Sequence, residues 1–124
     1  MWIFTTDGFF SAVAAREGKG EPGQPVDLKR VMVRARVKQH LVNLQKRFAC
    51  FAQEQIMETP EADYRYRIIL DREAWSQVLA ELALDVYPNF KSKAHEQQEK
   101  LGNGYVRSLH QVWQHMYELQ AVNN

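Results

Sequence analysis

Apolar and aromatic positions predict extended structure at the start of the chain. They fill residues 2–4 and 9–13, on either side of Asp7-Gly8. Aromatic and β-branched side chains favour a pleated strand, and an Asp-Gly pair is typical of a tight turn or a bulge. We therefore expect residues 2–14 to form one bulged strand or two short strands.

Two later stretches, 30–37 and 63–70, alternate more clearly, and a short strand is expected between them at 55–58. In the first stretch, one face carries Val31, Val33, Ala35 and Val37, and the other carries Met32, Arg34 and Arg36. In the second, one face carries Tyr64, Tyr66, Ile68 and Leu70, and the other carries Arg65, Arg67 and Ile69. We expect the faces without arginine to pack inward against helices.

Apolar residues at helical spacing predict helices at 39–52 and 72–86. The first stripe is Leu41, Leu44, Phe48 and Phe51, and the second is Trp75, Val78, Leu79, Leu82 and Val86. Asp71 is a suitable N-cap for the second helix, and Tyr87-Pro88 ends it.

Two more helices are expected at the C-terminal end of the chain. Asn89 can cap a short polar helix that runs to about Lys100, and Gly102-Asn103-Gly104 separates it from a last helix at 104–121. The last helix is expected to bury Tyr105, Leu109, Val112, Trp113, Met116 and Leu119. Its apolar stripe is a core face or, in the alternative, a face that covers a partner subunit.

The order of these elements predicts a single α+β domain spanning residues 1–124. The middle of the chain reads β-α-β-β-α, which is most of a ferredoxin-like unit. A strand from the N-terminus would complete a four-stranded, mainly antiparallel sheet of permuted ferredoxin-like topology, with both helices on one face. Residues 17–30 would be a flexible loop, rich in Gly and Pro at 17–25, and residues 88–124 a helical extension packed on the domain.

Composition narrows the class of protein. The net charge is +1, which argues against a polycation, and 45% hydrophobic residues argue against wholesale disorder. One cysteine excludes an intrachain disulfide. There is no apolar run long enough for a membrane span and no basic segment typical of a signal peptide, so we expect a cytoplasmic protein.

Charge is uneven along the chain. Residues 16–47 carry a net +6, and residues 48–86 carry a net −5. Two neighbouring elements of one domain can complement each other in this way. Alternatively, the surface is bipolar and docks onto a second copy of the chain.

The candidate binding residues are arginines of the two alternating strands. If those strands are neighbours, Arg34, Arg36, Arg65 and Arg67 gather on the face of the sheet that the helices leave open. One like-charge pair at strand spacing costs on the order of 3 kcal/mol at an effective dielectric near 20. We therefore expect a partner that neutralises this cluster.

Three partners remain open for the arginines. Glu58 and Asp63 can form ordinary ion pairs with them, or acidic groups of a second subunit can cover them. In the third alternative they bind an anion or a nucleic acid, because a guanidinium donates two parallel hydrogen bonds to a phosphate or carboxylate. Trp2 and Phe4 would then be available for base stacking.

The sequence gives little indication of a metal site, a reactive cysteine or a catalytic residue. His110 and His115 are five residues apart and do not share a helix face, and the four histidines are expected at the surface or at its boundary, so we expect no metal site and no cofactor. Cys50 is expected to be a buried structural thiol. No nucleophile has a recognisable base, so no catalytic residue is assigned and the question of enzymatic activity stays open.

Several short motifs together resemble a family of short bacterial proteins that has no established activity. The motifs are residues 2–13, Val33-Arg34-Ala35-Arg36, Thr59-Pro60, Ala62-Asp63-Tyr64-Arg65-Tyr66-Arg67, Trp75, Tyr87-Pro88-Asn89-Phe90-Lys91, Trp113 and Met116. The resemblance covers most of the chain outside 17–25. It implies a bacterial, cytoplasmic, single-domain protein and assigns no catalytic or binding residue.

Two hypotheses of function follow. The first is a non-enzymatic homodimeric binding or assembly module that uses the open face of the sheet. The second is a protein, possibly an enzyme, that binds an anion, a nucleotide or a nucleic acid through the arginines.

Overall fold

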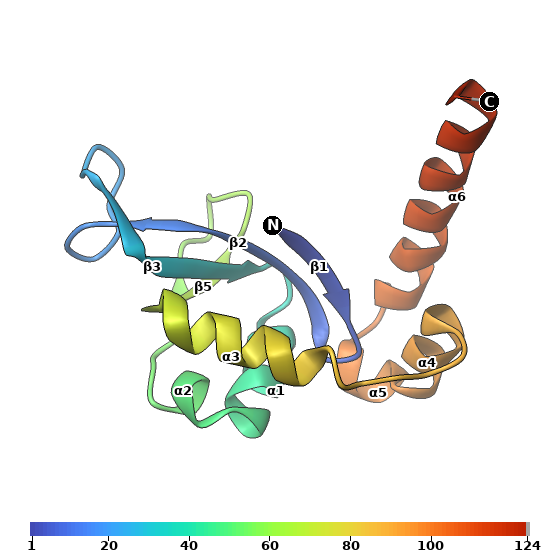
Figure 1. Ribbon diagram of the computed structural model, residues 1–124, viewed down its shortest axis with the longest axis horizontal. Helices are drawn as coiled ribbons and strands as arrows, with labels where there is room; N and C mark the ends of the chain where they lie inside the picture. The colour runs from blue at the N-terminus through green and yellow to red at the C-terminus, as the bar shows by residue number, and fades with distance from the viewer. Residues whose placement is uncertain (124) are drawn as a thin grey trace.

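The computed structural model describes residues 1–123, which form one open antiparallel sheet and six helices (Figure 1). The strands are β1 (Trp2–Thr5), β2 (Gly8–Arg16), β3 (Val26–Ala35), β4 (Met57–Glu58) and β5 (Tyr66–Asp71). The helices are α1 (Lys38–Arg47), α2 (Ala49–Ala52), α3 (Arg72–Leu82), α4 (Phe90–Glu96), α5 (Gln98–Leu101) and α6 (Tyr105–Asn123). The α+β class is confirmed.

The sheet has five strands in the order β1-β2-β3-β5-β4, and all neighbours are antiparallel. The expected number of four was wrong because the N-terminal segment turns at Thr6-Asp7 and supplies two full strands. Thr5 closes this turn, since its Oγ1 accepts from the N–H groups of Asp7 and Gly8 at 3.0 and 3.1 Å. The expected neighbourhood of β3 and β5 is confirmed, with Arg34 opposite Arg67.

Strand boundaries differ from the expectation at three places. β3 begins at Val26, so the loop expected at 17–30 is shorter at its C-terminal end. β3 ends at Ala35, which leaves Arg36 outside the ladder. β5 begins only at Tyr66, because the Thr59 N–H donates to the Arg65 carbonyl at 2.8 Å and closes a loop between β4 and β5.

Helix boundaries also differ. The helix expected at 39–52 is interrupted at Phe48, whose backbone is extended (φ −124°, ψ 125°). The helix expected at 72–86 ends at Leu82, and Asp71 occupies its N-cap position without a side-chain cap bond. The helix expected at 89–100 is divided into α4 and α5, and its Asn89 cap is confirmed by a 2.9 Å bond from the Ser92 N–H.

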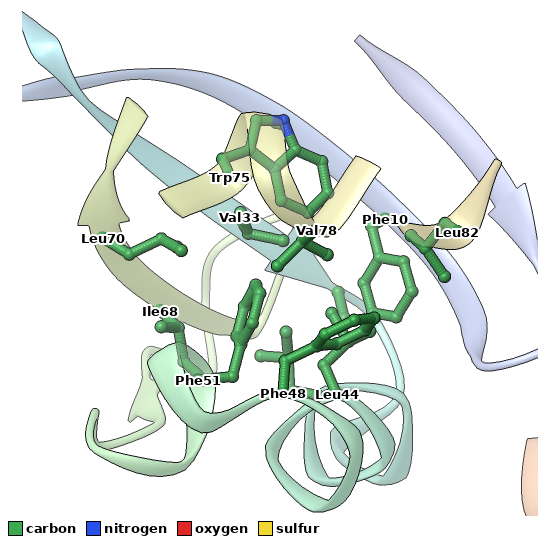
Figure 2. Packing of buried hydrophobic residues seen from close by; sticks show 13 residues of the cluster. Phe10, Val33, Leu44, Phe48, Phe51, Ile68, Leu70, Trp75, Val78 and Leu82 are labelled. Atoms are coloured by element: carbon green, nitrogen blue, oxygen red, sulfur yellow. The ribbon is translucent and has the colours of Figure 1, made fainter. Parts of the chain in front are cut away.

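The main core lies between the sheet and helices α1, α2 and α3 (Figure 2). Its side chains alternate along β3 and β5, as the sequence pattern predicts: Val33, Ala35, Ile68 and Leu70 are buried here. Phe10 comes from β2, Phe48 comes from the extended residue between α1 and α2, and the helices supply Leu44, Phe51, Trp75, Val78 and Leu82. Each fully buried large side chain contributes about 1.5–3 kcal/mol relative to exposure. This core fixes the sheet against the three helices, and we call the face of the sheet that packs here the inner face.

A second, smaller core forms where the C-terminal helices meet the β1-β2 hairpin. Ala94, Leu101, Tyr105 and Leu109 are buried against the half-buried Phe4 and Phe9. Beyond Leu109, α6 leaves the body, and its C-terminal end lies far from the sheet in Figure 1. The expected burial of Val112, Trp113, Met116 and Leu119 was therefore wrong within the chain, because all four are exposed.

A buried polar cluster fastens the C-terminal helices to the domain. The Asp7 side chain is only 1% exposed and contacts Arg47 Nη1 at 2.7 Å and Lys100 Nζ at 2.5 Å. Asn43 Nδ2 donates to the carbonyls of Asp7 and Lys100 at 2.8 and 3.0 Å. Arg47 also forms two bonds to Asp85, which raise the pKa of Arg47. These contacts join β1-β2, α1 and α5 at one end of the sheet.

His40 belongs to the same cluster and is 2% exposed, so its expected position at the surface or at its boundary was wrong. Its Nδ1 accepts from the Phe9 N–H at 3.3 Å, and its Nε2 lies 2.7 Å from the Leu101 carbonyl, which assigns the proton to Nε2. Burial lowers the pKa of His40. The ring lies against Gly8, where a Cβ atom would approach His40 Cγ to 2.2 Å. Only glycine fits this position, and its φ of +147° adds to that requirement.

Candidate functional site

The sheet presents a second face, opposite the main core, which we call the outer face. Because side chains alternate along a strand, the register assigns one cross-strand row to this face. The row runs through Trp2, Ser11, Arg34, Arg67 and Met57, and we call it the middle row. The middle row crosses all five strands, so residues far apart in the sequence meet in it.

Other parts of the chain cover the outer face on both sides of the middle row. On one side, the loop after β2 approaches Met32 and Ile69 so closely that a Cβ atom on Gly20 would lie 3.0–3.2 Å from their methyl groups. On the other side, α4, α5 and α6 pack against Phe4 and Phe9. The middle row is left between these two covers.

Arg34 and Arg67 are directly opposite each other in the middle row and are both half-buried. Arg34 Nη2 donates to Ser11 Oγ at 2.7 Å. No carboxylate within residues 1–123 forms an ion pair with either guanidinium. The Nε atoms of both residues are buried without a hydrogen-bond partner in the described chain. A like-charge pair with unsatisfied donors is unfavourable in a folded protein.

Tyr64 joins this pair from the loop before β5. It was expected to point toward the helices, and this was wrong because the strand periodicity does not extend into the loop. Its ring is 4% exposed and lies under Arg34 and Arg36, whose guanidinium carbons are 4.4 and 4.3 Å from the ring centroid. The Tyr64 hydroxyl is buried and has no hydrogen-bond partner in the described chain.

The expected cluster of four arginines therefore forms only in part. Arg36 contacts the same Tyr64 ring as Arg34, and its Nε donates to the Asp63 carbonyl at 3.2 Å. Arg65 lies apart from the others and is paired with Glu58 through two contacts of 2.8 and 2.9 Å. Arg65 matches the ion-pair alternative, whereas Arg34 and Arg67 do not.

Aromatic residues adjoin the arginines. Phe9 contacts Phe4 (ring centroids 4.5 Å apart), Trp2 (5.8 Å, nearly perpendicular) and Tyr64 (6.4 Å). Trp2 remains 68% exposed. Between these rings and α6 lies a groove of about 350 Å³, lined by Trp2, Phe4, Phe9, Arg36, Tyr105 and Val112 among others. Flat apolar walls and a cation therefore meet at one groove.

The other residues considered from the sequence do not join this site. Cys50 is half-buried beside the main core, and burial raises the pKa of its thiol. In residues 1–123, no three His, Cys, Asp or Glu side chains lie close enough together to hold a metal ion. No helix in the same range combines the length and apolar character that a membrane crossing requires.

Sequence reasoning missed Ser11, Phe9 and Tyr64 as members of the site. A signal for Ser11 and Phe9 was present, since they share a strand face in the segment 9–13 once it is paired with β1. Tyr64 offered no such signal, because its direction depends on the loop that Thr59 and Arg65 close.

Comparisons with family models, with curated proteins and with solved structures found no match to the chain.

Proposed function

We propose that the protein binds an anionic ligand on the outer face of its sheet, at Arg34 and Arg67. The observation that carries the proposal is a set of three buried polar groups without a hydrogen-bond partner in the described chain, namely the Nε atoms of the opposed Arg34 and Arg67 and the hydroxyl of Tyr64, whose ring contacts Arg34. Buried polar groups in folded proteins are almost always hydrogen-bonded. These three buried groups leave this part of the fold short of acceptors, and a ligand bound to the half-buried guanidiniums of Arg34 and Arg67 would supply them.

Phosphate-type oxyanions suit these groups. A guanidinium presents its N–H groups as a planar fork, and a tetrahedral oxyanion can accept from two forks at once. The negative charge would also remove the repulsion between the two opposed arginines. Tyr64 holds Arg34 by a cation–π contact, and Ser11 accepts from its Nη2, so this guanidinium is positioned before the ligand arrives.

Calorimetric titration with inorganic phosphate tests the proposal. We expect the Arg34→Gln/Arg67→Gln variant to lose affinity by about tenfold or more, since charge-assisted bonds are lost. Arg65→Gln is the matched control, because this arginine also belongs to the 63–70 segment but already has Glu58 as its partner. We expect the control to change the affinity by less than about twofold.

The outcomes are distinct. Binding that is equal in the wild type and in Arg34→Gln/Arg67→Gln would overturn the proposal, and so would the absence of any phosphate binding by the wild type. A loss in the control as large as in the double variant would indicate a general charge effect and would also overturn it.

Self-association is a second candidate function, favoured by the exposed part of α6. Tyr105, Leu109, Val112, Met116 and Leu119 follow the alternating spacing of four and three residues that forms a helix-packing seam. The first two residues are buried on the domain, and the other three are exposed. A second copy of the chain offers an identical seam, which a two-fold dimer can pair with this one.

Charges on α6 do not oppose such pairing. Its only Lys, Arg, Asp or Glu residues in the described range are Arg107 and Glu118, and neither occupies the seam spacing. Light scattering on a sizing column tests the candidate. We expect a wild-type dimer and a monomeric Met116→Lys variant, with Leu84→Lys as a control at another exposed apolar residue outside the seam. A wild-type monomer would rule this candidate out.

The same experiment separates this candidate from an interface built on the arginines. If Arg34→Gln/Arg67→Gln remains a dimer, the guanidiniums are free for an anion. If it becomes a monomer, they belong to the subunit interface and the first proposal is weakened.

We also propose that the sheet is a permuted ferredoxin-like arrangement with an added edge strand. The spatial order β2-β3-β5-β4, with α1 and α3 on one face, supports it, and β1 would be the addition. A cytoplasmic location remains an expectation from the sequence, and no catalytic residue is proposed.

A further inference from the structure

We infer that the anion is the phosphate of a nucleotide unit, whose base lies in the groove beside Trp2. This inference rests on the proposed anion site at Arg34 and Arg67. It adds the class of ligand and a second group of contacting residues.

The middle row places Trp2, which would contact the base, at a defined spacing from Arg34, which would contact the phosphate. Trp2 is opposite Ser11, and Ser11 is opposite Arg34. Two strand spacings, about 10 Å, therefore separate the backbones of Trp2 and Arg34, and the Arg34 guanidinium reaches back toward Ser11. Both side chains rise from the same face, so a ligand with an anion at one end and a flat ring at the other can reach both.

The groove suits a flat aromatic ring. Its volume of about 350 Å³ is in the range of small-molecule sites, and Phe4, Phe9 and Val112 form apolar walls. Trp2 meets Phe9 almost at right angles and keeps most of its surface exposed, which leaves it available for stacking. Stacking of a base on an aromatic side chain is a general way to bind nucleotides.

Arg36 connects the groove to the anion site. It lines the groove and lies over the same Tyr64 ring that Arg34 contacts. A bare inorganic anion would engage the arginines but leave the apolar groove and Trp2 in water. A purely apolar ligand would fill the groove but leave Arg34 and Arg67 without acceptors. A nucleotide unit satisfies both.

Calorimetric titrations with two probes test the inference. Adenosine 5′-monophosphate and ribose 5-phosphate carry the same phosphate and sugar, and only the first has a base. We expect the wild type to bind the nucleotide about tenfold or more tightly than the sugar phosphate. Trp2→Ala should lose this preference and keep its affinity for ribose 5-phosphate. Trp113→Ala is the matched control, since Trp113 is also exposed but lies on α6 outside this groove.

Failure of the inference differs from failure of the anion site. If the wild type binds both probes equally, the base makes no contact and the inference is wrong, although the anion site stands. If neither probe binds, the anion site itself is wrong. If Trp2→Ala keeps the full preference, the base lies elsewhere and the inference is also wrong.

Free nucleotides and single-stranded nucleic acid both supply this unit. A titration with a ten-residue deoxythymidine strand, compared with thymidine 5′-monophosphate at several salt concentrations, distinguishes them. Tighter binding of the strand with a steeper salt dependence identifies a nucleic acid as the source. Equal affinity for each nucleotide unit identifies the free nucleotide. Either result supports the chemistry, and binding of neither probe contradicts it.

Discussion

The two faces of the sheet are built from the same strands, but one face carries apolar side chains and the other carries arginines. On the inner face, Val33 and Ile68 are completely buried among apolar neighbours. On the outer face, Arg34, one residue after Val33, and Arg67, one residue before Ile68, oppose each other with unsatisfied Nε atoms. The inner face is explained by burial within the chain. On the outer face, the Nε atoms of both arginines have no acceptor within residues 1–123, and this is the reason why we propose a function there.

The largest expected effect concerns the inner face. Phe51→Ala removes a fully buried ring that packs against Trp75 with centroids 6.3 Å apart. We expect the free energy of unfolding to fall by about 4 kcal/mol, as measured by urea denaturation. Leu84→Ala, at an exposed site, should change it little. Equal effects of the two substitutions would contradict the division into a packed face and an open face.

The next effect concerns the buried carboxylate at the end of the sheet. Asp7→Asn leaves Arg47 and Lys100 without their shared charge, although Arg47 keeps Asp85. We expect a loss of about 2 kcal/mol in the free energy of unfolding, because bonds to a charged group are lost. Glu73→Gln, in an exposed pair, serves as the control. No loss in Asp7→Asn would show that the charge of Asp7 is not needed to hold the C-terminal helices.

Much of the fold could be predicted from the sequence where one face of an element is buried within the chain. The alternation in β3 and β5 assigned Val33, Ile68 and Leu70 to the core correctly, because a strand with one buried face has a strict period of two. The same rule failed at Tyr64, where the strand has not yet begun. The helical spacing of apolar residues also did not predict the break between α1 and α2 at Phe48, since neither glycine nor proline marks it.

The site was predictable only in part, because it depends on long-range partners. The pairing of Arg34 with Arg67 followed from the strand faces, but the separation of Arg65 depended on Glu58. His40 and Asn43 were missed because polar residues at helix spacing usually face solvent. Here they meet the carbonyls of Leu101 and Lys100, about sixty residues away in the sequence. On α6, the pattern predicted an apolar face correctly but could not say whether the chain itself covers it.

A smaller effect depends on pH and on His40, which lies where the two faces meet. Burial lowers the pKa of His40 in the folded state, so the neutral form is the one that the fold stabilises. The stability contributed by this group is complete above its unfolded pKa of about 6.5 and is lost as the pH falls through the lower folded pKa. We expect the free energy of unfolding to decline below pH 6.5 with a slope of up to about 1.4 kcal/mol per pH unit from this proton.

Denaturation measured at several pH values checks this expectation, with His40→Gln as the comparison. The variant is expected to be less stable at neutral pH but to lack the His40 part of the decline. If both proteins decline in parallel between pH 6.5 and 5, another group is responsible and His40 is not the residue that couples stability to pH.

The smallest expected effect on stability is also the most direct test of the contrast between the faces. Arg67→Met keeps an unbranched side chain of similar length in the middle row and removes one of two opposed charges. On an ordinary surface, loss of an arginine has little effect or destabilises. Here, relief of the repulsion should raise the free energy of unfolding by about 0.5 kcal/mol, while phosphate affinity falls. A gain in stability together with a loss of binding is expected of a surface whose charges are compensated only by a ligand. A loss of both would mean that Arg67 stabilises the fold through contacts within the chain, and the outer face would then need no ligand to explain it.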